Sequence, residues 1–409
     1  MVKQKLLSVD EAISKVRGGV QKVSSEKVSL SESLGRVLAT DVSSRLTHPP
    51  VAVSAMDGYA VQASDLSNTP ITLKQIGESS AGSGFKGAIK PGETVRIFTG
   101  APLPIGADTI VIQEVVSVDK ENITIKESSL KGKFVRSAGL DFYEGDILLK
   151  EGQVLSARDI GLAAAMNVTW LDVRRFPRIA YTATGDEIVM PGDPLGPDQI
   201  ISSNSIALGA YIKTLGGVPI NLGIARDNED ALHRVFSGAL GADMLVTLGG
   251  ASVGDYDFVR KVLDSEGMNL SFHKIAMRPG KPLIFGNLGN MAVLGLPGNP
   301  VSAGVTSAIF LKSAMSVMLG LDDDFNEPTR ALLGCKLEAN DFRQDYLRSS
   351  LTVNSKGNLE ATPFKQQDSS MMERLAKADC LVVRYPNAPA ANKGDRVDIV
   401  MLGSSMYRF

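Results

Sequence analysis

The chain has 409 residues, which is too long for one ordinary domain, so we expect roughly two to four domains. Hydrophobic residues make up 44% and charged residues 22%, a composition typical of a globular protein with several cores. The formal net charge of −2 argues against non-specific binding of nucleic acid, because no surplus of positive charge exists to displace counterions.

The few cysteines and histidines argue against several kinds of structural and catalytic site. The two cysteines, Cys335 and Cys380, are far apart in the chain, and its three histidines are His48, His233 and His273. A disulfide scaffold, a zinc site and a Ser-His-Asp triad are therefore disfavoured. The start MVKQKLLSVDEA has no signal-peptide core, and no apolar run approaches the length needed to cross a bilayer. We expect a cytoplasmic protein without a membrane partner.

Helix-start patterns occur twice in residues 1–45. In SVDEAISKV, Ser8 is followed three residues later by Glu11, which is the pattern of a capping box. In SLSESLGRVLA, Ser29 and Glu32 repeat the pattern. The sequence therefore predicts two short helices here.

Residues 46–145 are rich in Gly, Pro and β-branched residues. TVRIFTG, TIVIQEVVSV and NITIKES predict short strands between turns, and so a β-rich insertion domain. Beyond it, residues 146–176 include SARDIGLAAAMNV, which has a helical pattern. We expect this helix to pack on the N-terminal helices, so that 1–45 and 146–176 form one discontinuous linker and dimerisation domain.

Strand and helix patterns alternate through residues 177–325. This alternation predicts a parallel, doubly wound α/β sheet, and such sheets bind ligands at the carboxyl ends of their strands. Residues 326–409 return to short strands and predict a small β domain. The expected fold class is thus a multi-domain combination of α/β and β.

The stretch LPGNPVSAG, residues 296–304, lies between a predicted strand and a predicted helix. Asn299 is placed as the helix N-cap and Pro300 as the first helical residue, while Gly298 allows close approach of a ligand. The free N–H groups of the helix start, with Ser302 among them, favour an anion. Taken alone, the stretch favours a well-made strand-to-helix turn over an anion site.

Two further segments strengthen the anion-binding interpretation. TLGGASVGDYD, residues 247–257, is a second strand-to-helix junction whose glycines bracket Ser252. A loop of this kind is a weak signal by itself, and two such loops ending strands of one sheet are a much stronger one. KIAMRPGKP, residues 274–282, carries Lys274, Arg278 and Lys281 between Pro-Gly turns. The alternative is a solvated basic surface, but rigid basic residues favour an anion clamp.

Carboxylates follow three of the predicted strands. Asp186 and Glu187 follow the first, Asp227 the second and Asp257 the third. Each is also acceptable as an ordinary cap or surface acid. Together with two phosphate-type loops they predict a magnesium-assisted phosphate site, because Mg²⁺ is usually held by one or two carboxylates plus phosphate oxygens.

In the insertion, SAMDGYAV and FTGAPLP contain Asp57-Gly58 and Thr99-Gly100. From composition alone, these two dipeptides predict two tight β-turns and no more.

Together these segments resemble the molybdenum insertases of the MoeA type, the molybdopterin molybdenumtransferases, whose relatives include gephyrin. The resemblance covers SAMDGYAV, TGAPLP, ADTIVIQE, TGDEI, SNS, GGASVGDYDF, RPGKP and LPGNPVS, in the family's order. It implies a central MogA-like α/β domain, a C-terminal β-barrel-like domain, and an elongated homodimer of four-domain subunits. It also implies an active site between the α/β domain of one subunit and the β-rich insertion of the other.

The implied reaction takes adenylylated molybdopterin and molybdate as substrates, uses Mg²⁺, and yields molybdenum cofactor and AMP. By motif match the polar candidates are Asp57, Thr99, Asp141, Glu187, Asp227 and Asp257. We assign catalysis to Asp57, Thr99, Asp227 and Asp257, and the metal to Asp186, Glu187, Asp227 and Asp257. The substrate-binding candidates are Gly249, Gly250, Ser252, Gly254, Lys274, Arg278, Lys281, Pro297, Gly298, Asn299, Pro300 and Ser302. Ser252, Arg278, Lys281 and Ser302 are expected to form a molybdate cradle.

One departure concerns AGLDFYEGD, where Leu140 stands in place of the Glu of the family's Gly-Glu-Asp element. Three alternatives remain: a molybdopterin adenylyltransferase, a non-catalytic molybdopterin-binding scaffold, and a nucleotide-hydrolysing relative of the α/β domain. The adenylyltransferase and molybdoenzyme acceptors are the macromolecular partners that the resemblance allows.

Overall fold

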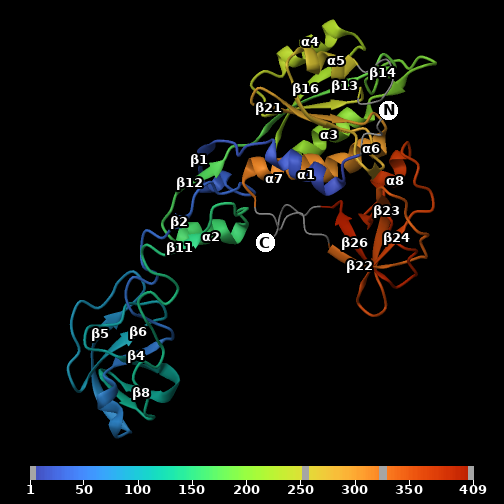
Figure 1. Cartoon of the computed structure of the whole chain (residues 1–409). Coiled ribbons are helices and arrows are strands. Elements are labelled where there is room, and N and C mark those ends of the chain that lie inside the picture. The colour runs from blue at the N-terminus through green and yellow to red at the C-terminus, as the bar shows by residue number, and fades with distance from the viewer. Residues whose placement is uncertain (1–5, 251–257, 322–328, 404–409) are drawn as a thin grey trace.

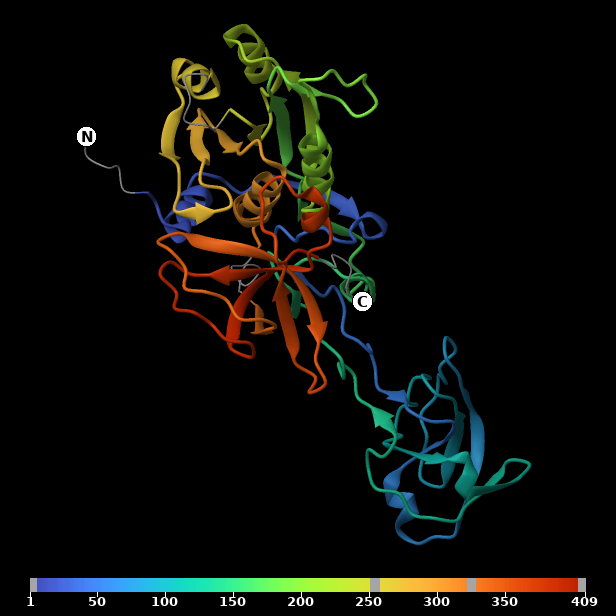
Figure 2. The ribbon, with the colours of Figure 1, turned by 90° about the vertical axis from the view of Figure 1, so that its right-hand side faces the viewer.

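The structure is a computed structural model that describes residues 6–250, 258–321 and 329–403. The chain forms an elongated molecule in which a small β lobe stands apart from two lobes that contact each other (Figures 1 and 2). The two contacting lobes are the α/β domain and the C-terminal β domain.

The α/β domain contains a six-stranded sheet in the order β16-β13-β17-β21-β20-β18. The strands are β13 (Arg178–Thr184), β16 (Val218–Ala225), β17 (Met244–Leu248), β18 (Asn269–His273), β20 (Ile284–Leu288) and β21 (Met291–Leu296). The first four in spatial order are parallel, as predicted, whereas β20 runs antiparallel to β21 and β18 antiparallel to β20. The expected purely parallel sheet is therefore wrong at one edge, where a Gly-Asn turn after Leu288 closes a hairpin.

Helices cover both faces of this sheet, which confirms the doubly wound architecture. One face carries α1 (Val9–Gly18), α3 (Ser203–Thr214), α6 (Pro300–Thr306), a π-helical turn (Ser307–Leu311) and α7 (Lys312–Leu319). The other face carries α4 (Glu229–Gly238) and α5 (Phe258–Ser265). All residues of β17 and β21 are buried, as expected for strands covered on both sides.

The helical unit Pro300–Leu319 corrects one expectation. It is long and apolar enough to cross a membrane by length and composition, although no apolar run of that kind was expected. In the structure 83% of its most apolar window is buried inside the protein, as in the core helix of a globular domain.

The N-terminal segment contains one of the two helices predicted there. In α1, Ser8 and Glu11 form the expected capping box, but the helix packs on the α/β domain through Val9, Ala12 and Val16. The second predicted helix is wrong. Its residues form strand β1 (Ser25–Ser29) and a short 3₁₀ turn (Leu30–Glu32), in which Ser29 makes no side-chain cap.

A connecting region joins the α/β domain to the distant β lobe. There β1 pairs with β12 (Trp170–Arg174), and β2 (Val42–Ser43) pairs with β11 (Ile147–Leu149). Helix α2 (Ala157–Ala165) begins with a Ser156–Asp159 capping box. It shares a core with Val28, Leu38, Leu149 and Val173, so it packs on the paired strands of this connecting region and not on α1.

The β-rich insertion forms the distant lobe (Figure 1). Its six-stranded sheet has the order β7-β4-β6-β5-β9-β8. These strands are β4 (Gly58–Val61), β5 (Ile71–Ser79), β6 (Glu93–Ile97), β7 (Thr109–Ile112), β8 (Val116–Asp119) and β9 (Asn122–Ile125). Strands β3 (Val53–Ser54) and β10 (Val135–Arg136) pair separately, and 3₁₀ turns lie at Ala63–Ser67 and Gln113–Val115.

The C-terminal domain is a closed β-barrel. Its strands are β22 (Thr329–Leu333), β23 (Gln344–Val353), β24 (Leu359–Pro363), β25 (Cys380–Arg384) and β26 (Arg396–Met401), and helix α8 (Met372–Ala376) precedes β25. Pairing of β23 with β25 closes the barrel. Strand β19 (Met277–Arg278) belongs by sequence to the α/β domain, yet it pairs with the start of β23.

Candidate functional site

The carboxyl edge of the parallel strands brings the predicted loops together. The backbone N–H of Gly249, after β17, donates to Leu296 O of β21 at 3.0 Å. A Cβ added to Gly249 would lie 2.9 Å from Thr184 O of β13, and one added to Gly298 would lie 3.6 Å from the Gly249 Cα. Gly249 thus allows the ends of β13 and β17 to meet closely, with the Gly298 loop in ordinary contact beside them, and Gly249 and Gly250 both have positive φ.

The LPGNP stretch is a strand-to-helix junction, as predicted. Asn299 is the N-cap of α6 and Pro300 its first residue, but the Asn299 side chain makes no cap. It donates instead to Ser369 Oγ at 3.0 Å, and the Val301 N–H donates to Ser369 O at 3.1 Å. The helix start is therefore partly covered by a loop of the C-terminal domain, and Ser302 in its first turn is buried.

Two residues at this junction were not among the predicted site residues. Ser369 has no sequence pattern that would have revealed it, since it lies 70 positions from Asn299. Asn204, in the SNS motif and at the start of α3, donates from Nδ2 to Gly298 O at 2.6 Å. The motif was visible in the sequence, and its contact with the LPGNP loop required the fold.

Residues 274–282 leave the sheet at the same edge. Because β18 is antiparallel to β20, and β20 to β21, the end of β18 lies beside the carboxyl ends of the parallel strands. Lys274 follows β18, Lys281 is exposed, and a Cβ on Gly280 would lie 2.5 Å from Thr306 Cγ2 of α6. The segment with the predicted basic residues therefore packs against the helix of the LPGNP junction.

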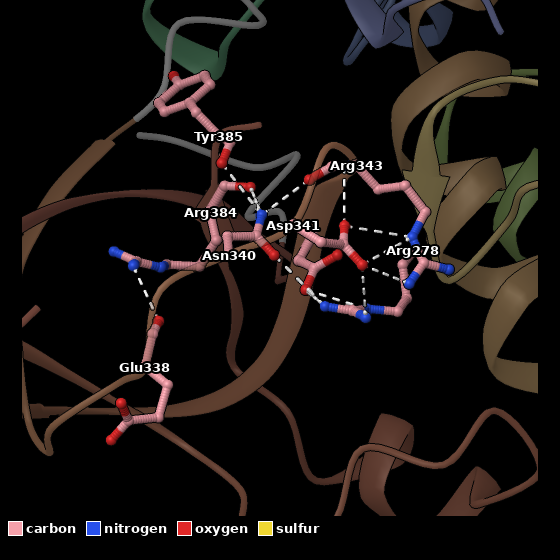
Figure 3. Close-up of polar contacts among 8 residues, drawn as sticks. Arg278, Glu338, Asn340, Asp341, Arg343, Arg384 and Tyr385 are labelled. Carbon is pink, nitrogen blue, oxygen red and sulfur yellow. Dashed lines mark hydrogen bonds and ion pairs between the residues drawn. The ribbon is translucent and has the colours of Figure 1, made fainter. Parts of the chain in front are cut away.

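Arg278 is engaged differently from its predicted role. Its guanidinium bonds Asp345 through Nε at 3.0 Å and through Nη2, and bonds Asp341 Oδ2 through Nη1 at 3.3 Å (Figure 3). Both acids belong to the C-terminal domain. The structure thus groups Arg278 with barrel carboxylates, whereas Lys281 remains on the surface.

The acids after β13 and β16 form a second group. The Asp227 N–H donates to Asp186 Oδ1 at 3.4 Å, and Arg226 donates from Nη1 to Asp186 O at 2.7 Å. Burial, and next the charges of Asp186 and Glu187, raise the pKa of Asp227 above its ordinary value. Glu187 folds back over Gly185, where an added Cβ would lie 2.4 Å from Glu187 Oε2. The three carboxylates therefore lie close enough for the negative charges of Asp186 and Glu187 to disfavour the ionised form of Asp227.

The metal assignment is not confirmed by these residues alone. Among the residues that the structure describes, no group of three or more His, Cys, Asp or Glu side chains could hold a metal ion. Asp257, with Ser252 and Gly254, lies outside the described residues.

In the insertion, Asp57 and Thr99 are directly bonded. Asp57 Oδ1 accepts from the Thr99 N–H at 2.7 Å and from the Thr99 hydroxyl at 2.8 Å. These two bonds, followed by the charge of Arg96, hold the pKa of Asp57 below its usual range. A Cβ on Gly58 would lie 2.0 Å from Val111 O, so the strand that begins directly after Asp57 admits only glycine at its first position. The two turns expected from composition are thus joined by hydrogen bonds, and we call this pair of turns the Asp57–Thr99 corner.

Arg96 supports this corner from strand β6. Its Nη1 donates to Gly58 O at 2.8 Å and its Nη2 to Gln113 Oε1 at 2.6 Å. The guanidinium also lies 4.8 Å from the Phe98 ring centroid and 5.1 Å from that of Tyr59. The planar guanidinium therefore holds the backbone at Gly58, directly after Asp57.

Within one subunit the corner and the sheet edge belong to separate lobes. Strands β4 and β6 lie in the distant lobe, whereas β13, β16 and β21 lie in the α/β domain (Figure 1). Asp141 is exposed on the segment that returns from the insertion, where its N–H donates to His48 O at 3.1 Å, and Leu140 beside it is 61% exposed. One chain by itself therefore does not bring the two predicted halves of the site together.

Comparisons with known proteins match the whole architecture. The model of the MoeA N-terminal region (domain I and II) matches residues 7–167, that of a probable molybdopterin binding domain residues 180–316, and that of the MoeA C-terminal region (domain IV) residues 330–402. The chain is similar to the molybdopterin molybdenumtransferase of Haemophilus influenzae, with 33% identity over 96% of this chain and 98% of that one. It is also similar to the molybdopterin molybdenumtransferase of a Nostoc species, with 40% identity over 72% of this chain and 70% of that one.

Among solved structures, the chain is similar to the molybdopterin biosynthesis MoeA protein from Pyrococcus horikosii. The TM-score is 0.86 with 30% identity, over 98% of this chain and all of that one (100%). The agreement spans all the domains described above. The chain belongs to the family of MoeA proteins, the molybdopterin molybdenumtransferases.

Proposed function

We propose that this chain inserts molybdenum from molybdate into adenylylated molybdopterin and releases AMP. The observation that carries the proposal is the extent of the family match. A molybdopterin-binding domain alone would cover residues 180–316, whereas the relatives named molybdenumtransferases match 96% of the chain, including the insertion with Asp57 and Thr99. That extent favours the insertase over the adenylyltransferase and over a hydrolase built on the α/β domain.

The carboxyl edge of the sheet provides the binding surface for the anionic substrates. Gly249, Gly250 and Gly298 let the backbone approach a phosphate group, and the start of α6 adds partial positive charge. Lys281, exposed on the segment whose Gly280 lies against Thr306 of α6, supplies a point charge. In the proposal, Lys281, Ser302 and the predicted Ser252 receive molybdate, while Pro297 and Pro300 keep the loop rigid.

The crowded acids fit a Mg²⁺ ion held partly by substrate. Asp186, Glu187 and Asp227 are oxygen donors. Burial, and next the charges of Asp186 and Glu187, raise the pKa of Asp227, and a hard cation would relieve the repulsion between these acids. Mg²⁺ usually combines one or two carboxylates with phosphate oxygens of the substrate. In the proposal Glu187, Asp227 and Asp257 hold the ion, which would neutralise charge on the phosphoanhydride.

The Asp57–Thr99 corner completes the site from a partner subunit. Thr99 keeps Asp57 ionised and fixes its carboxylate, which is the preparation expected of a group that positions a cation or a water. Since the corner lies in a different lobe from the sheet edge, a homodimer in which the lobes cross supplies both halves. The protein carries out this chemistry, in our proposal, in the cytoplasm.

A non-catalytic scaffold is the remaining alternative. It would bind molybdopterin at the same edge without turning it over, and nothing in such a role requires the corner at Asp57.

The test is AMP release from adenylylated molybdopterin with Mg²⁺, with and without molybdate. Molybdate-dependent AMP, together with product that reconstitutes an apo-molybdoenzyme, is the expected result. AMP that appears only when ATP and unmodified molybdopterin are consumed would favour the adenylyltransferase. Absence of AMP from a folded dimer would favour the scaffold.

A further inference from the structure

The C-terminal barrel is attached to the substrate-binding segment of the α/β domain by a shared strand. Met277 and Arg278 of β19 pair in parallel with Gln344 and Asp345 at the start of β23. The Gln344 N–H also donates to Ala276 O at 2.9 Å. Residues 274–282, which carry Lys281, are therefore hydrogen-bonded to the barrel through their own backbone.

A side-chain network reinforces this ladder. Arg278 bonds Asp345 Oδ2, Asp341 Oδ2 at 3.3 Å and Asn340 Oδ1 at 3.3 Å. Arg343 holds the same Asp341 Oδ2 at 2.6 Å, so that two guanidinium groups converge on one carboxylate (Figure 3). Asn340 Nδ2 in turn donates to Arg343 O at 2.7 Å and Arg384 O at 2.9 Å.

The burial of Asp345 decides how firmly Arg278 is held. Asp345 is only 4% exposed, and burial raises its pKa although Arg278 opposes the rise. If Arg278 turned away to a ligand, the Asp345 carboxylate would remain buried without its cation, which is strongly unfavourable. The exposed fraction of the Arg278 side chain, 47%, shows that the residue reaches the surface but not that it is free to leave.

The barrel contacts the second anion-binding segment as well. Ser369 bonds Asn299 and Val301 at the start of α6, and a Cβ on Gly304 would lie 2.5 Å from Leu375 Cδ2 of α8. One domain therefore contacts both the RPGKP and the LPGNP segments, which otherwise belong to different strand ends.

We propose that Arg278 is a positioning residue, by which Asp345 and Asp341 of the barrel hold residues 274–282 in the geometry that places Lys281 toward the anion. The proposal rests on the proposed function, since it assigns a role within that site. It replaces the expectation that Arg278 itself binds molybdate.

The two roles predict opposite effects of removing the acids. If Arg278 positions the loop, Asp345→Asn and Arg278→Gln both raise the KM for molybdate, by about 10- to 100-fold, with a smaller change in kcat. The double variant is then no worse than either single variant, because both break one contact. If Arg278 binds the anion directly, Asp345→Asn frees it and lowers the KM, while Arg278→Gln raises it, and that pattern would overturn the proposal.

Two further variants keep the comparison sharp. Asp341→Asn changes a less buried partner of Arg278 and serves if Asp345→Asn does not fold; it should shift the KM in the same direction. Glu360→Gln is the matched control, because it removes a barrel carboxylate that pairs with Lys393 and not with the α/β domain. An equal KM shift in the control would mean that any loss of barrel charge has this effect, and would overturn the positioning role.

Hydrogen exchange of the backbone amides gives a readout that does not depend on activity. Asp345→Asn should speed exchange at residues 277–278 and 344–346 relative to wild type and to Glu360→Gln. Unchanged exchange there would refute the proposal that Asp345 and Asp341 hold residues 274–282 through Arg278, even in an active enzyme. Suppose exchange is faster but the wild-type protein shows no molybdate-dependent AMP release. The structural role of Arg278 would then stand and the proposed function would be rejected.

Discussion

Thr99 gives a single oxygen of Asp57 two hydrogen bonds, from its backbone N–H at 2.7 Å and from its hydroxyl at 2.8 Å. The two residues lie 42 positions apart, Asp57 just before β4 and Thr99 just after the neighbouring strand β6. A substitution at Thr99 can remove the hydroxyl bond and keep the backbone bond, so the contribution of the hydroxyl to the Asp57 pKa and to activity can be measured by itself.

Thr99→Val should lower the rate of AMP release by about 10- to 100-fold, because the Asp57 carboxylate loses one of its two fixed donors. The hydroxyl favours the ionised form of Asp57, so its removal raises the Asp57 pKa toward the ordinary value. The loss of activity on acidification should then begin at a higher pH than in wild type. Thr99→Ser, which keeps the hydroxyl, should retain the wild-type pH profile; an identical profile in Thr99→Val would contradict the role of this bond.

Asp227→Asn should lose activity but gain stability at neutral pH. The folded-state pKa of Asp227 is raised, so the charged form is disfavoured by folding above the unfolded pKa, and stability falls as pH rises through that region. The neutral amide removes this cost, and the gain should vanish below about pH 3.9, where both states are protonated. Thermal unfolding midpoints at pH 7 and pH 3.5 check the sign. A destabilised variant at pH 7 would contradict the cost that burial and the neighbouring acids impose on ionised Asp227.

Gly58→Ala should destabilise the insertion by about 1–3 kcal/mol or more, because the new methyl group would meet a strand backbone and not a flexible side chain. The clash is with Val111 O at 2.0 Å. Gly161→Ala in α2 is the control, since nothing lies within 4 Å of its added Cβ and alanine favours helix. Denaturant unfolding followed by limited proteolysis of the insertion would detect the difference; equal stability of the two variants would refute the tight strand contact.

Lys281→Ala should raise the molybdate concentration for half-maximal AMP release by about tenfold, because a positive charge on the segment that packs against α6 is lost. Lys336→Ala, an exposed barrel lysine that pairs with Glu338, should leave it unchanged. Unaltered molybdate dependence in Lys281→Ala would mean that the cradle lies elsewhere.

Local sequence patterns predicted much of the fold, but the same pattern had two outcomes. Ser8 with Glu11 and Ser29 with Glu32 are alike in sequence, and only the first pair caps a helix. Residues Ser25–Ser29 are instead paired, five in register, with Trp170–Arg174. That partner strand lies far away in sequence, so no window around Ser29 contains the information that decides its structure.

The site shows the same limit. The glycine loops and the LPGNP junction were visible because each is defined by neighbouring residues, and strand order then brought them together. The charge of Arg278 was visible too, and the sequence predicted that it would bind an anion. The structure instead pairs it with Asp341 and Asp345, which come from another domain and could not be recognised as its partners from the sequence. Ser369 was missed for the same reason.

The most direct test of the shared-site proposal is complementation between inactive subunits. Asp57→Ala and Asp227→Asn chains, carrying different affinity tags, would be co-expressed and the mixed dimer purified through both tags. If each site takes Asp57 from one subunit and Asp227 from the other, about half of the sites in the mixed dimer are intact, and AMP release should reach about half the wild-type rate. A mixed dimer as inactive as its two parents would contradict a site shared between subunits.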